Sequence, residues 1–189
     1  IADVKCSETL FQEIARNGGD PVMWMTGHSL VKSKMTETNA PLAGELSGHI
    51  FFADRWYGFD DAIYATLRLL NIMARDENTQ ETCPALSRFF TDIPSVPGTP
   101  EIRIDVPEER KFEIVQNVRD QMLRRLGTDS VDTLDGLRVR TESGWWLLRA
   151  SNTQNALVLR AEAETQNALN RILEDLRSML AAEDVEVPA

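Results

Sequence analysis

The sequence predicts an α/β domain followed by a small α+β domain, and three observations support this prediction. In the first half, a helix joins two strand-like runs, an order that implies a parallel pair of strands. In the second half, several short strands follow one another around a hairpin-type turn, which favours an antiparallel sheet. Three prolines and a glycine lie between the halves. We therefore expect domains over 1–91 and 101–189, joined by a linker over 92–100.

The first domain begins inside a strand. Residues 1–5 resemble the end of a strand without an initiator Met, so we expect a piece of a longer protein and a truncated βαβ unit in a mixed sheet. Ser7 is a typical N-cap for the next helix, and Gly18-Gly19 ends that helix. Asp60-Asp61 is expected to cap a later helix. The other elements expected are a short buried strand over 21–25, helices over 30–38, 62–74 and 83–90, and a strand over 50–52.

The second domain is expected to be an antiparallel sheet with helices on one face. Residues 101–106 alternate with period two, so one face of this strand should be buried. Asp135-Gly136 is typical of a hairpin turn. A helix over 108–126 is expected to bury Phe112, Val115, Val118, Met122 and Leu126. The other elements expected are strands over 133–134, 137–140, 145–148 and 156–159, a helix over 165–180, and a frayed acidic tail over 182–189.

Charge and composition argue against several classes of function. The 189 residues carry a formal net charge of −10, whereas a nucleic-acid or anionic-membrane partner would favour a basic surface. No apolar run approaches the ~18 residues of a transmembrane helix, and no secretory signal pattern is present. Cys6 and Cys83 lack metal-ligand spacing, so we expect no metal site. In a cytoplasmic protein we expect free thiols, and a Cys6–Cys83 disulfide is the less favoured alternative.

A polar hexapeptide, Gly-Glu-Leu-Ser-Gly-His, occupies residues 44–49. Glu45, Ser47 and His49 alternate, so in extended backbone they would project to one side. A carboxylate and a hydroxyl can bind adjacent sugar hydroxyls, and His49 can bind or move a proton near neutral pH. On spacing alone, a polar surface loop is the better-supported interpretation. The apolar residues expected to point into the fold are Leu46, Ile50 and Phe52.

Two further candidates, His28 and Lys5, directly follow predicted strands. Ligands of open parallel sheets bind at the carboxyl ends of the strands, which favours a functional site here. For His28, a structural role in capping the next helix is equally well supported by its position. For Lys5, an ordinary surface lysine is the commoner interpretation. Both histidines of the chain lie in glycine-flanked loops, which favours function.

An Arg-Ala-Ser-Asn-Thr string separates two apolar strands at residues 149–153. Arg149 ends a strongly apolar strand, and its guanidinium presents donors in a fork that matches phosphate. Ser151, Asn152 and Thr153, with the N–H groups of the loop, are able to complete a nest for an anion. An ordinary hairpin loop is the alternative, because the same residues are common turn formers. A sugar-binding loop and a phosphate-binding loop together suggest a phosphosugar ligand.

The order and context of these strings resemble the α-D-phosphohexomutases, in particular the carboxyl-terminal part of the bacterial phosphomannomutase/phosphoglucomutase branch. The matching strings are residues 3–6, 26–30, 44–49, 55–61 and 149–153. The resemblance implies that Glu45, Ser47 and His49 contact the sugar in the family's third domain. It also implies that Lys5, His28 and His49 line the catalytic cleft. In the fourth domain, the residues that would bind the phosphate that is not transferred are Arg149, Ser151, Asn152 and Thr153.

The resemblance further implies parts that this chain does not contain. The family's phosphoserine and Mg²⁺ loops lie in amino-terminal domains, which would be partners of this chain within one protein, and a hexose 1,6-bisphosphate serves as intermediate and activator. We therefore expect the substrate-binding part of a mutase for glucose or mannose phosphates, inactive by itself. The alternative is a stand-alone, non-catalytic phosphosugar-binding or interaction module. Asn155 stands where many relatives have Pro, which puts the rigidity of the phosphate loop in question.

Overall fold

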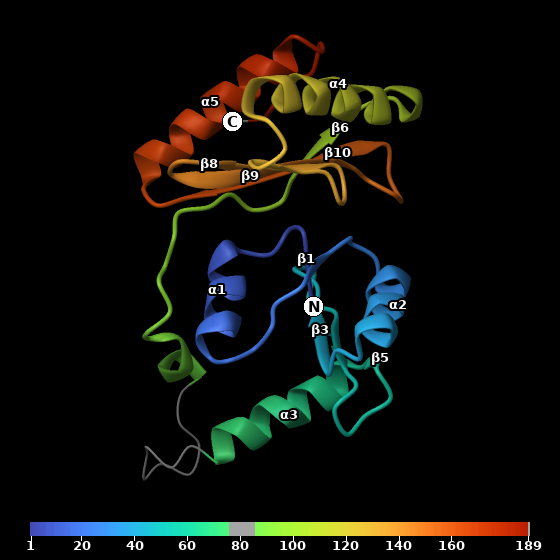
Figure 1. The fold of residues 1–189 in the computed structure, drawn as a ribbon, viewed down its shortest axis with the longest axis vertical. Coiled ribbons are helices and arrows are strands. Elements are labelled where there is room, and N and C mark those ends of the chain that lie inside the picture. The colour runs from blue at the N-terminus through green and yellow to red at the C-terminus, as the bar shows by residue number, and fades with distance from the viewer. Residues whose placement is uncertain (76–85, 189) are drawn as a thin grey trace. The chain divides into compact units, whose positions relative to one another are not determined.

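The computed structural model describes residues 1–75 and 86–188. Its contacts divide the chain into two units, Ile1–Ser95 and Val96–Ala189 (Figure 1). The predicted fold classes are confirmed, since the first unit has a mixed sheet with helices and the second has an antiparallel sheet with helices. The exact limits of the predicted linker stay a prediction. Within the described ranges, no helix is long and apolar enough to cross a membrane.

The first unit is built on a five-stranded sheet in the order β2-β1-β3-β4-β5. Strand β1 runs parallel to β2 and β3, and β4 and β5 extend the sheet in antiparallel fashion. Helices α1 and α2 flank this sheet from opposite sides (Figure 1). The strands are β1 (Ala2–Asp3), β2 (Met23–Trp24), β3 (Leu42–Gly44), β4 (Ile50–Phe52) and β5 (Phe59–Asp60). The helices are α1 (Glu8–Arg16), α2 (His28–Thr38), α3 (Ala62–Ala74) and the 3₁₀ helix η1 (Leu86–Phe90).

Two predicted helix starts of the first unit, those of α1 and α3, are confirmed by their caps, whereas α2 begins at His28, two residues before the expected start. The Ser7 hydroxyl accepts a hydrogen bond from Thr9 N at 3.2 Å, and the Asp61 carboxylate accepts one from Tyr64 N at 2.9 Å. Asp60 does not cap the helix, so the prediction that both aspartates do so is corrected. Cys83 and the first part of the helix expected over 83–90 lie outside the described residues.

The inward residue of β4 is Phe51, which corrects the orientation expected for this strand. Phe51 is fully buried and packs with Val31 and Met35 of α2, whereas Leu46 and Ile50 are exposed and Phe52 is half-buried. Side chains alternate along a strand, so burial of Phe51 beneath α2 turns its two neighbours the other way. Strand β2 is likewise shorter than expected and half-buried, because it lies at the edge of the sheet.

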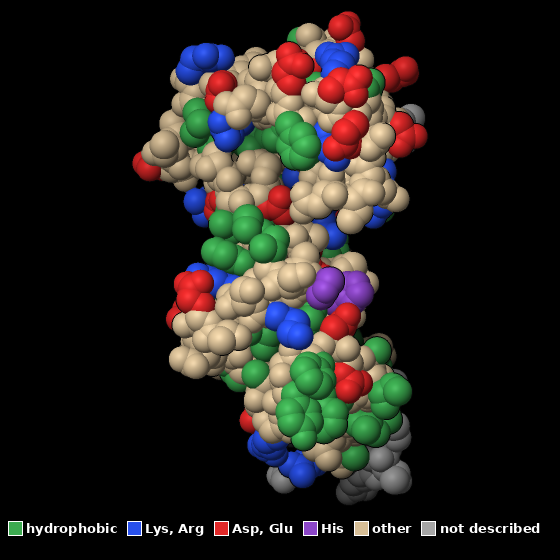
Figure 2. All heavy atoms as spheres, turned by 90° about the vertical axis from the view of Figure 1, so that its right-hand side faces the viewer, with side chains coloured by type: hydrophobic (Ala, Val, Ile, Leu, Met, Phe, Trp, Pro, Cys, Tyr) green, Lys and Arg blue, Asp and Glu red, His purple; other side chains and the backbone are tan. Residues whose placement is uncertain are grey.

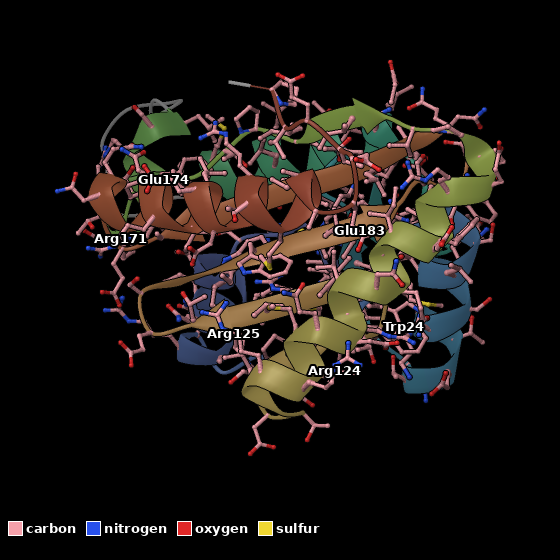
Figure 3. All side chains as sticks on the ribbon, turned by 90° about the horizontal axis from the view of Figure 1, so that it is seen from above. Trp24, Arg124, Arg125, Arg171, Glu174 and Glu183 are labelled. Atoms are coloured by element: carbon pink, nitrogen blue, oxygen red, sulfur yellow. The ribbon has the colours of Figure 1, made fainter. Side chains whose placement is uncertain are left out.

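The second unit is a five-stranded antiparallel sheet in the order β6-β10-β9-β8-β7. Helices α4 and α5 cover one face of it, as predicted (Figures 1 and 3). The strands are β6 (Ile102–Asp105), β7 (Val131–Asp132), β8 (Leu137–Thr141), β9 (Gly144–Ala150) and β10 (Ala156–Ala163). The helices are α4 (Glu108–Leu126) and α5 (Gln166–Ala181). Part of the predicted linker pairs with this sheet, because Thr99 N donates to Ala161 O at 2.8 Å.

Helix α4 has the predicted bounds but a different inward face. Phe112 and Leu126 are 58% and 41% exposed, which corrects the expectation that both are buried. Ile114 packs in the core instead, with Val115, Val118 and Met122. Lys111, one turn before Ile114, is also buried. The apolar pattern predicted a different face because it placed the apolar Phe112 in the core, whereas the neighbouring Lys111 occupies the inward position.

The strand expected over 133–134 is wrong, since β7 ends at Asp132. The Asp132 carboxylate accepts a hydrogen bond from Leu134 N at 2.8 Å. This contact forms an Asx turn, which takes the chain out of the ladder directly after β7. Residues 133–136 therefore form the connection to β8, with Asp135-Gly136 at its end.

The C-terminal segment is packed and not frayed, which corrects a further expectation. Val185 and Val187 are buried in the core of the second unit. Glu183 fixes the segment to α4, since its carbonyl accepts from Arg110 at 2.9 Å and its carboxylate accepts from Asn117 at 3.0 Å. The prediction relied on the acidic content of the segment and overlooked that Val185 and Val187 are two residues apart. Both valines face the core, so only the other side of the segment faces solvent.

Replacement of Val185 by Ala should therefore destabilise the second unit. Two buried methyl groups are lost, at about 0.8 kcal/mol each before any cost of the cavity. We expect the free energy of unfolding, measured by chemical denaturation, to fall by roughly 1–2.5 kcal/mol. Glu186→Ala is the matched control, because Glu186 is the exposed neighbour and its loss should change stability by less than about 0.5 kcal/mol. Equal effects of the two substitutions would indicate a frayed tail.

Candidate functional site

The fully buried carboxylate of Asp3 organises the carboxyl end of β1. Its Oδ1 accepts from Leu46 N at 3.3 Å and from Cys6 Sγ at 3.1 Å. Its Oδ2 accepts from Thr26 Oγ1 at 3.3 Å and lies 3.5 Å from Lys5 Nζ. One side chain therefore ties together the ends of β1 and β2 and the loop that contains Glu45.

Lys5 lies at the end of β1, as predicted, but it is buried and not a surface lysine. A buried ammonium is costly unless it is paired, and Asp3 provides the opposite charge. Sequence reasoning gave Asp3 no role of its own. The sequence nevertheless contains a signal for Asp3, because this residue lies between Ala2 and Val4 in an otherwise apolar strand. An Asp that is buried in such a strand requires partners.

Glu45 is buried and turned toward the start of α2. Its Oε1 accepts a hydrogen bond of 2.6 Å from the N–H of Gly27, the residue before α2. A carboxylate is favoured at this position because the amino end of a helix carries a partial positive charge. His28, the first residue of α2, is exposed beside this contact. Glu45, Lys5 and His28 are thus brought to one edge of the sheet.

The loop over 45–49 is a tight turn and not the extended segment expected. Glu45 N donates to His49 O and Gly48 N donates to Glu45 O, both at 2.9 Å. Gly48 has a φ of 93°, which favours glycine at this position. Glu45 consequently faces inward, while Ser47 lies exposed at the tip of the turn. The expectation that alternate residues project to one side is therefore wrong for this loop.

The ring of His49 is oriented by Asp60. Nδ1 of His49 lies 2.6 Å from Oδ2 of Asp60, across the ladder between β4 and β5. Because the carboxylate accepts, Nδ1 carries the proton and Nε2 is left for a ligand. His49 is half-exposed, and histidine atoms reach the surface of the first unit in Figure 2. Asp60 was missed because the acidic pair was assigned as a whole to the helix cap.

Arg149 is presented at the end of β9 by a carboxylate from the β7–β8 connection. Arg149 is buried, and its Nε donates to Asp135 Oδ2 at 3.1 Å. Among the residues that the structure describes, its two terminal NH₂ groups have no partner. The fork that matches a phosphate therefore remains available, while the guanidinium is fixed through its third nitrogen.

Gly136 allows Asp135 to approach this closely. A Cβ at Gly136 would lie 2.4 Å from Leu148 O and 2.6 Å from Arg149 Cβ, and the φ of Gly136 is 79°. Both the backbone conformation and the space require glycine. The Asp135-Gly136 pair, predicted only as a turn, thus also packs against the backbone of Arg149.

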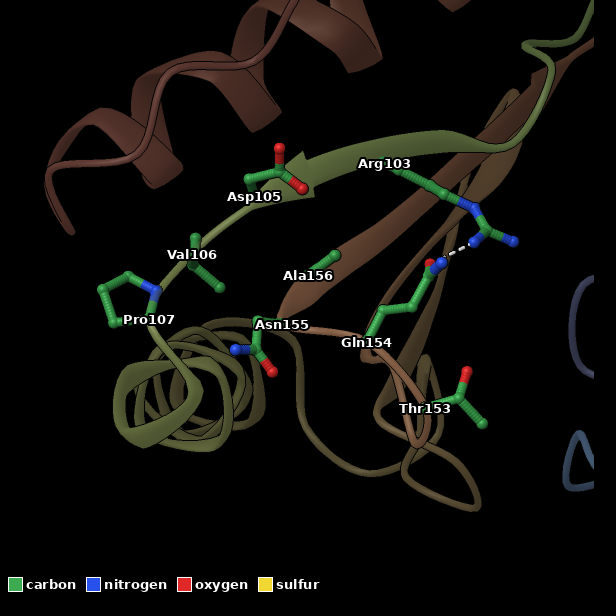
Figure 4. A pocket seen from close by; sticks show the side chains of 8 residues that line it. All are labelled: Arg103, Asp105, Val106, Pro107, Thr153, Gln154, Asn155 and Ala156. Carbon is green, nitrogen blue, oxygen red and sulfur yellow. Dashed lines mark hydrogen bonds between the residues drawn. The ribbon is translucent and has the colours of Figure 1, made fainter.

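The three polar residues predicted to bind phosphate lie together on the loop after β9. Asn152 and Thr153 are exposed, whereas Ser151 is buried. Ser151 Oγ accepts from Gln154 N at 3.2 Å and from Thr153 N at 3.4 Å, so it stabilises the loop from within and keeps its own proton for donation. Thr153 and Gln154 also line an open pocket of about 820 Å³ beside β6 (Figure 4).

Clustered metal-ligating side chains are absent from the described part of the chain. Within residues 1–75 and 86–188, no group of three or more His, Cys, Asp or Glu side chains is placed to hold an ion.

Comparisons with known proteins match both units. Residues 1–89 match the family model "Phosphoglucomutase/phosphomannomutase, alpha/beta/alpha domain III", and residues 101–179 match the model of the C-terminal domain of the same family. A phosphomannomutase/phosphoglucomutase from Pseudomonas aeruginosa is 48% identical over 188 residues. That alignment covers all of this chain and 39% of the relative, so the chain spans well under half of that protein.

Solved structures of similar proteins give the same result. A phosphoglucomutase/phosphomannomutase family protein from Burkholderia thailandensis has a TM-score of 0.83 and 42% identity, and the match covers all of this chain and 38% of that one. An Aspergillus fumigatus N-acetylphosphoglucosamine mutase in complex with glucose 1,6-bisphosphate has a TM-score of 0.66 at 14% identity. Its match covers 95% of this chain and 37% of that one, and it shows similarity of fold.

The position of Asp3 predicts a large effect of its removal. Asp3→Ala would remove a fully buried carboxylate that pairs with Lys5 and accepts hydrogen bonds from Thr26 and Leu46, and breaking a buried charge network of this kind costs about 3–5 kcal/mol in comparable cases. We expect a decrease of that size in the free energy of unfolding of the first unit, measured by chemical denaturation.

Glu37→Ala is the matched control for Asp3→Ala. Glu37 also pairs with a lysine, Lys34, at 2.7 Å, but its side chain is 65% exposed. Surface ion pairs contribute little, so this change should lower stability by less than about 1 kcal/mol. If Asp3→Ala were as mild as the control, Asp3 would not be the organising group of the site.

Proposed function

The chain belongs to the phosphoglucomutase/phosphomannomutase family, and we propose that it is the substrate-binding part of a hexose-phosphate mutase. The whole protein would interconvert the 1-phospho and 6-phospho forms of glucose or mannose. The observation that carries this proposal is Arg149, a buried arginine whose terminal NH₂ groups are available next to a polar loop. A rigid, desolvated fork of this kind suits a doubly charged phosphate.

In this proposal, the loop after β9 binds the phosphate that is not transferred. Arg149 supplies the charge-assisted hydrogen bonds, and Ser151, Asn152 and Thr153 supply hydroxyl, amide and main-chain donors. Holding the distal phosphate fixes the sugar relative to the reacting end. Fixing the substrate in this way lowers the entropy cost of reaching the reactive geometry.

The loop over 45–49 would bind the hexose. Glu45 has one carboxylate oxygen held by Gly27, and its second oxygen is suited to accept from sugar hydroxyls. Ser47 adds a hydroxyl at the tip of the turn. Lys5, His28 and His49 are the candidate catalytic residues. Of these, His49 is best arranged to move a proton, because Asp60 fixes its tautomer and directs Nε2 outward.

The remaining chemistry is assigned to the amino-terminal domains of the same protein. There we propose the serine that carries the transferred phosphoryl group, and the Mg²⁺ that neutralises charge on it. A hexose 1,6-bisphosphate would be the intermediate, which is consistent with the glucose 1,6-bisphosphate in the Aspergillus mutase complex. A cytoplasmic location stays part of the proposal.

Arg149→Ala in the whole protein should raise the KM for glucose 1-phosphate roughly 10–100-fold. A charge-assisted contact contributes on the order of 1.5–3 kcal/mol, and 1.4 kcal/mol is a factor of ten. The kcat should fall as well, because a loosely held sugar is misaligned. Arg149→Lys keeps the charge but loses the fork, so its defect should be intermediate. A coupled assay for glucose 6-phosphate measures both constants.

Arg140→Ala is the control for Arg149→Ala. Arg140 lies at the opposite end of the β8–β9 pair, where it is exposed and donates to the Asp129 carbonyl. Its loss should leave KM within about twofold of the wild type, as expected for a surface side chain away from the loop. Wild-type constants for a folded Arg149→Ala variant would show that the loop is not the phosphate site.

A second expectation concerns this chain in isolation. Residues 1–189 alone should not convert glucose 1-phosphate at any Mg²⁺ concentration, because the proposed nucleophile and metal ligands belong to other domains. The whole protein, purified in the same way, is the positive control. The assignment of roles would be contradicted if the isolated chain converted glucose 1-phosphate and this activity co-purified with the chain through several columns.

A further inference from the structure

A buried lysine of α4 holds the loop that follows β9. Lys111 is only 3% exposed, and its Nζ donates to Ser151 O at 2.9 Å and to Gln154 O at 3.2 Å. The same Nζ pairs with Glu108 Oε2 at 2.7 Å. The lysine belongs to the first turn of α4, some forty residues before the loop in sequence, so this contact fixes the loop to a rigid helix.

The three partners satisfy the ammonium completely. A lysine ammonium has three N–H donors, and here two are used by loop carbonyls and one by Glu108. Burial of a charge is tolerated only with such pairing. Lys111 consequently has no donor left for a phosphate. Its contribution to anion binding must come from the shape that it gives the loop.

The bond to Ser151 O also decides where the next N–H group points. A trans peptide is planar, and its C=O and N–H groups point in opposite directions. By holding Ser151 O, Lys111 directs the N–H of Asn152 away from itself. That N–H has no acceptor among the residues that the structure describes, so it is oriented for a ligand. The same reasoning applies to Gln154 O and the N–H of Asn155.

We propose that Lys111 is a positioning residue for phosphate binding, which sets the main-chain N–H groups of the 151–155 loop. This inference rests on the proposed function, because it takes the loop to be the phosphate site. The two ends of the loop are held separately, by Ser151 N to Ala156 O at 2.9 Å and by Val106 N to Asn155 O at 3.0 Å.

The test is Lys111→Met in the whole protein, which keeps an unbranched side chain of nearly the same length and removes the donors. We expect KM for glucose 1-phosphate to rise about tenfold, as expected when hydrogen bonds to a charged group are lost. The kcat should fall less than about threefold. In hydrogen–deuterium exchange, protection of the Thr153 and Gln154 N–H groups, which donate to Ser151 Oγ, should be lost while that of α4 is retained. Lys111→Gln is the second variant, in case Lys111→Met does not fold.

Arg110→Met is the matched control. Arg110 is the neighbouring cation on α4 and also donates to a main-chain carbonyl, that of Glu183, at 2.9 Å. Its loss removes the same kind of bond from the C-terminal segment and not from the loop. KM and loop protection should therefore stay within about twofold of wild type, even if the melting temperature falls.

The outcomes separate this inference from the proposed function. If Arg149→Ala raises KM but a folded Lys111→Met or Lys111→Gln variant leaves it within twofold, the role of Lys111 is overturned and the function stands. Equal increases in KM for the Lys111 and Arg110 variants would also overturn it, because they would reflect general destabilisation. If Arg149→Ala itself has no effect, the proposed phosphate site fails first.

Discussion

A charged group removed from water has to be paired, and this requirement determines where the functional loops of both units lie. In the first unit, the buried carboxylate of Asp3 needs donors, and it obtains them from Lys5, Thr26 and the main chain at Leu46. In the second unit, the buried ammonium of Lys111 needs acceptors and finds two on the loop after β9. In each case the buried charge forms hydrogen bonds with main-chain groups of a loop, and these bonds hold the loop in place.

The sequence was sufficient for the fold class and for most elements, since these depend on local signals. The bounds of α4 follow from a long apolar periodicity that Gly127 ends, and the starts of α1 and α3 follow from caps at Ser7 and Asp61. Which face of a helix is inward is less local. For α4 the apolar pattern favoured Phe112, whereas Lys111 is inward because a distant loop provides its acceptors.

The candidate site likewise contains some residues that the sequence identifies and others that it does not. Its ligand-facing residues lie on short strings with recognisable chemistry, so Glu45, His49 and Arg149 could be identified before the structure was known. Their supports could not. The hydrogen bond from Leu46 to Asp3 spans 43 residues, and that between Arg149 and Asp135 spans 14 and requires the close packing of a glycine turn. Side chains that act through another residue carry no spacing signature, because the fold alone brings them together.

The packed C-terminal segment has a practical consequence for the choice of expression boundaries. The match to the family's C-terminal domain ends at residue 179, within α5, and invites trimming at that point. A recombinant protein that ended there would lack the last residues of α5 and the two core valines that follow. A recombinant protein that includes this domain should therefore extend at least through residue 187.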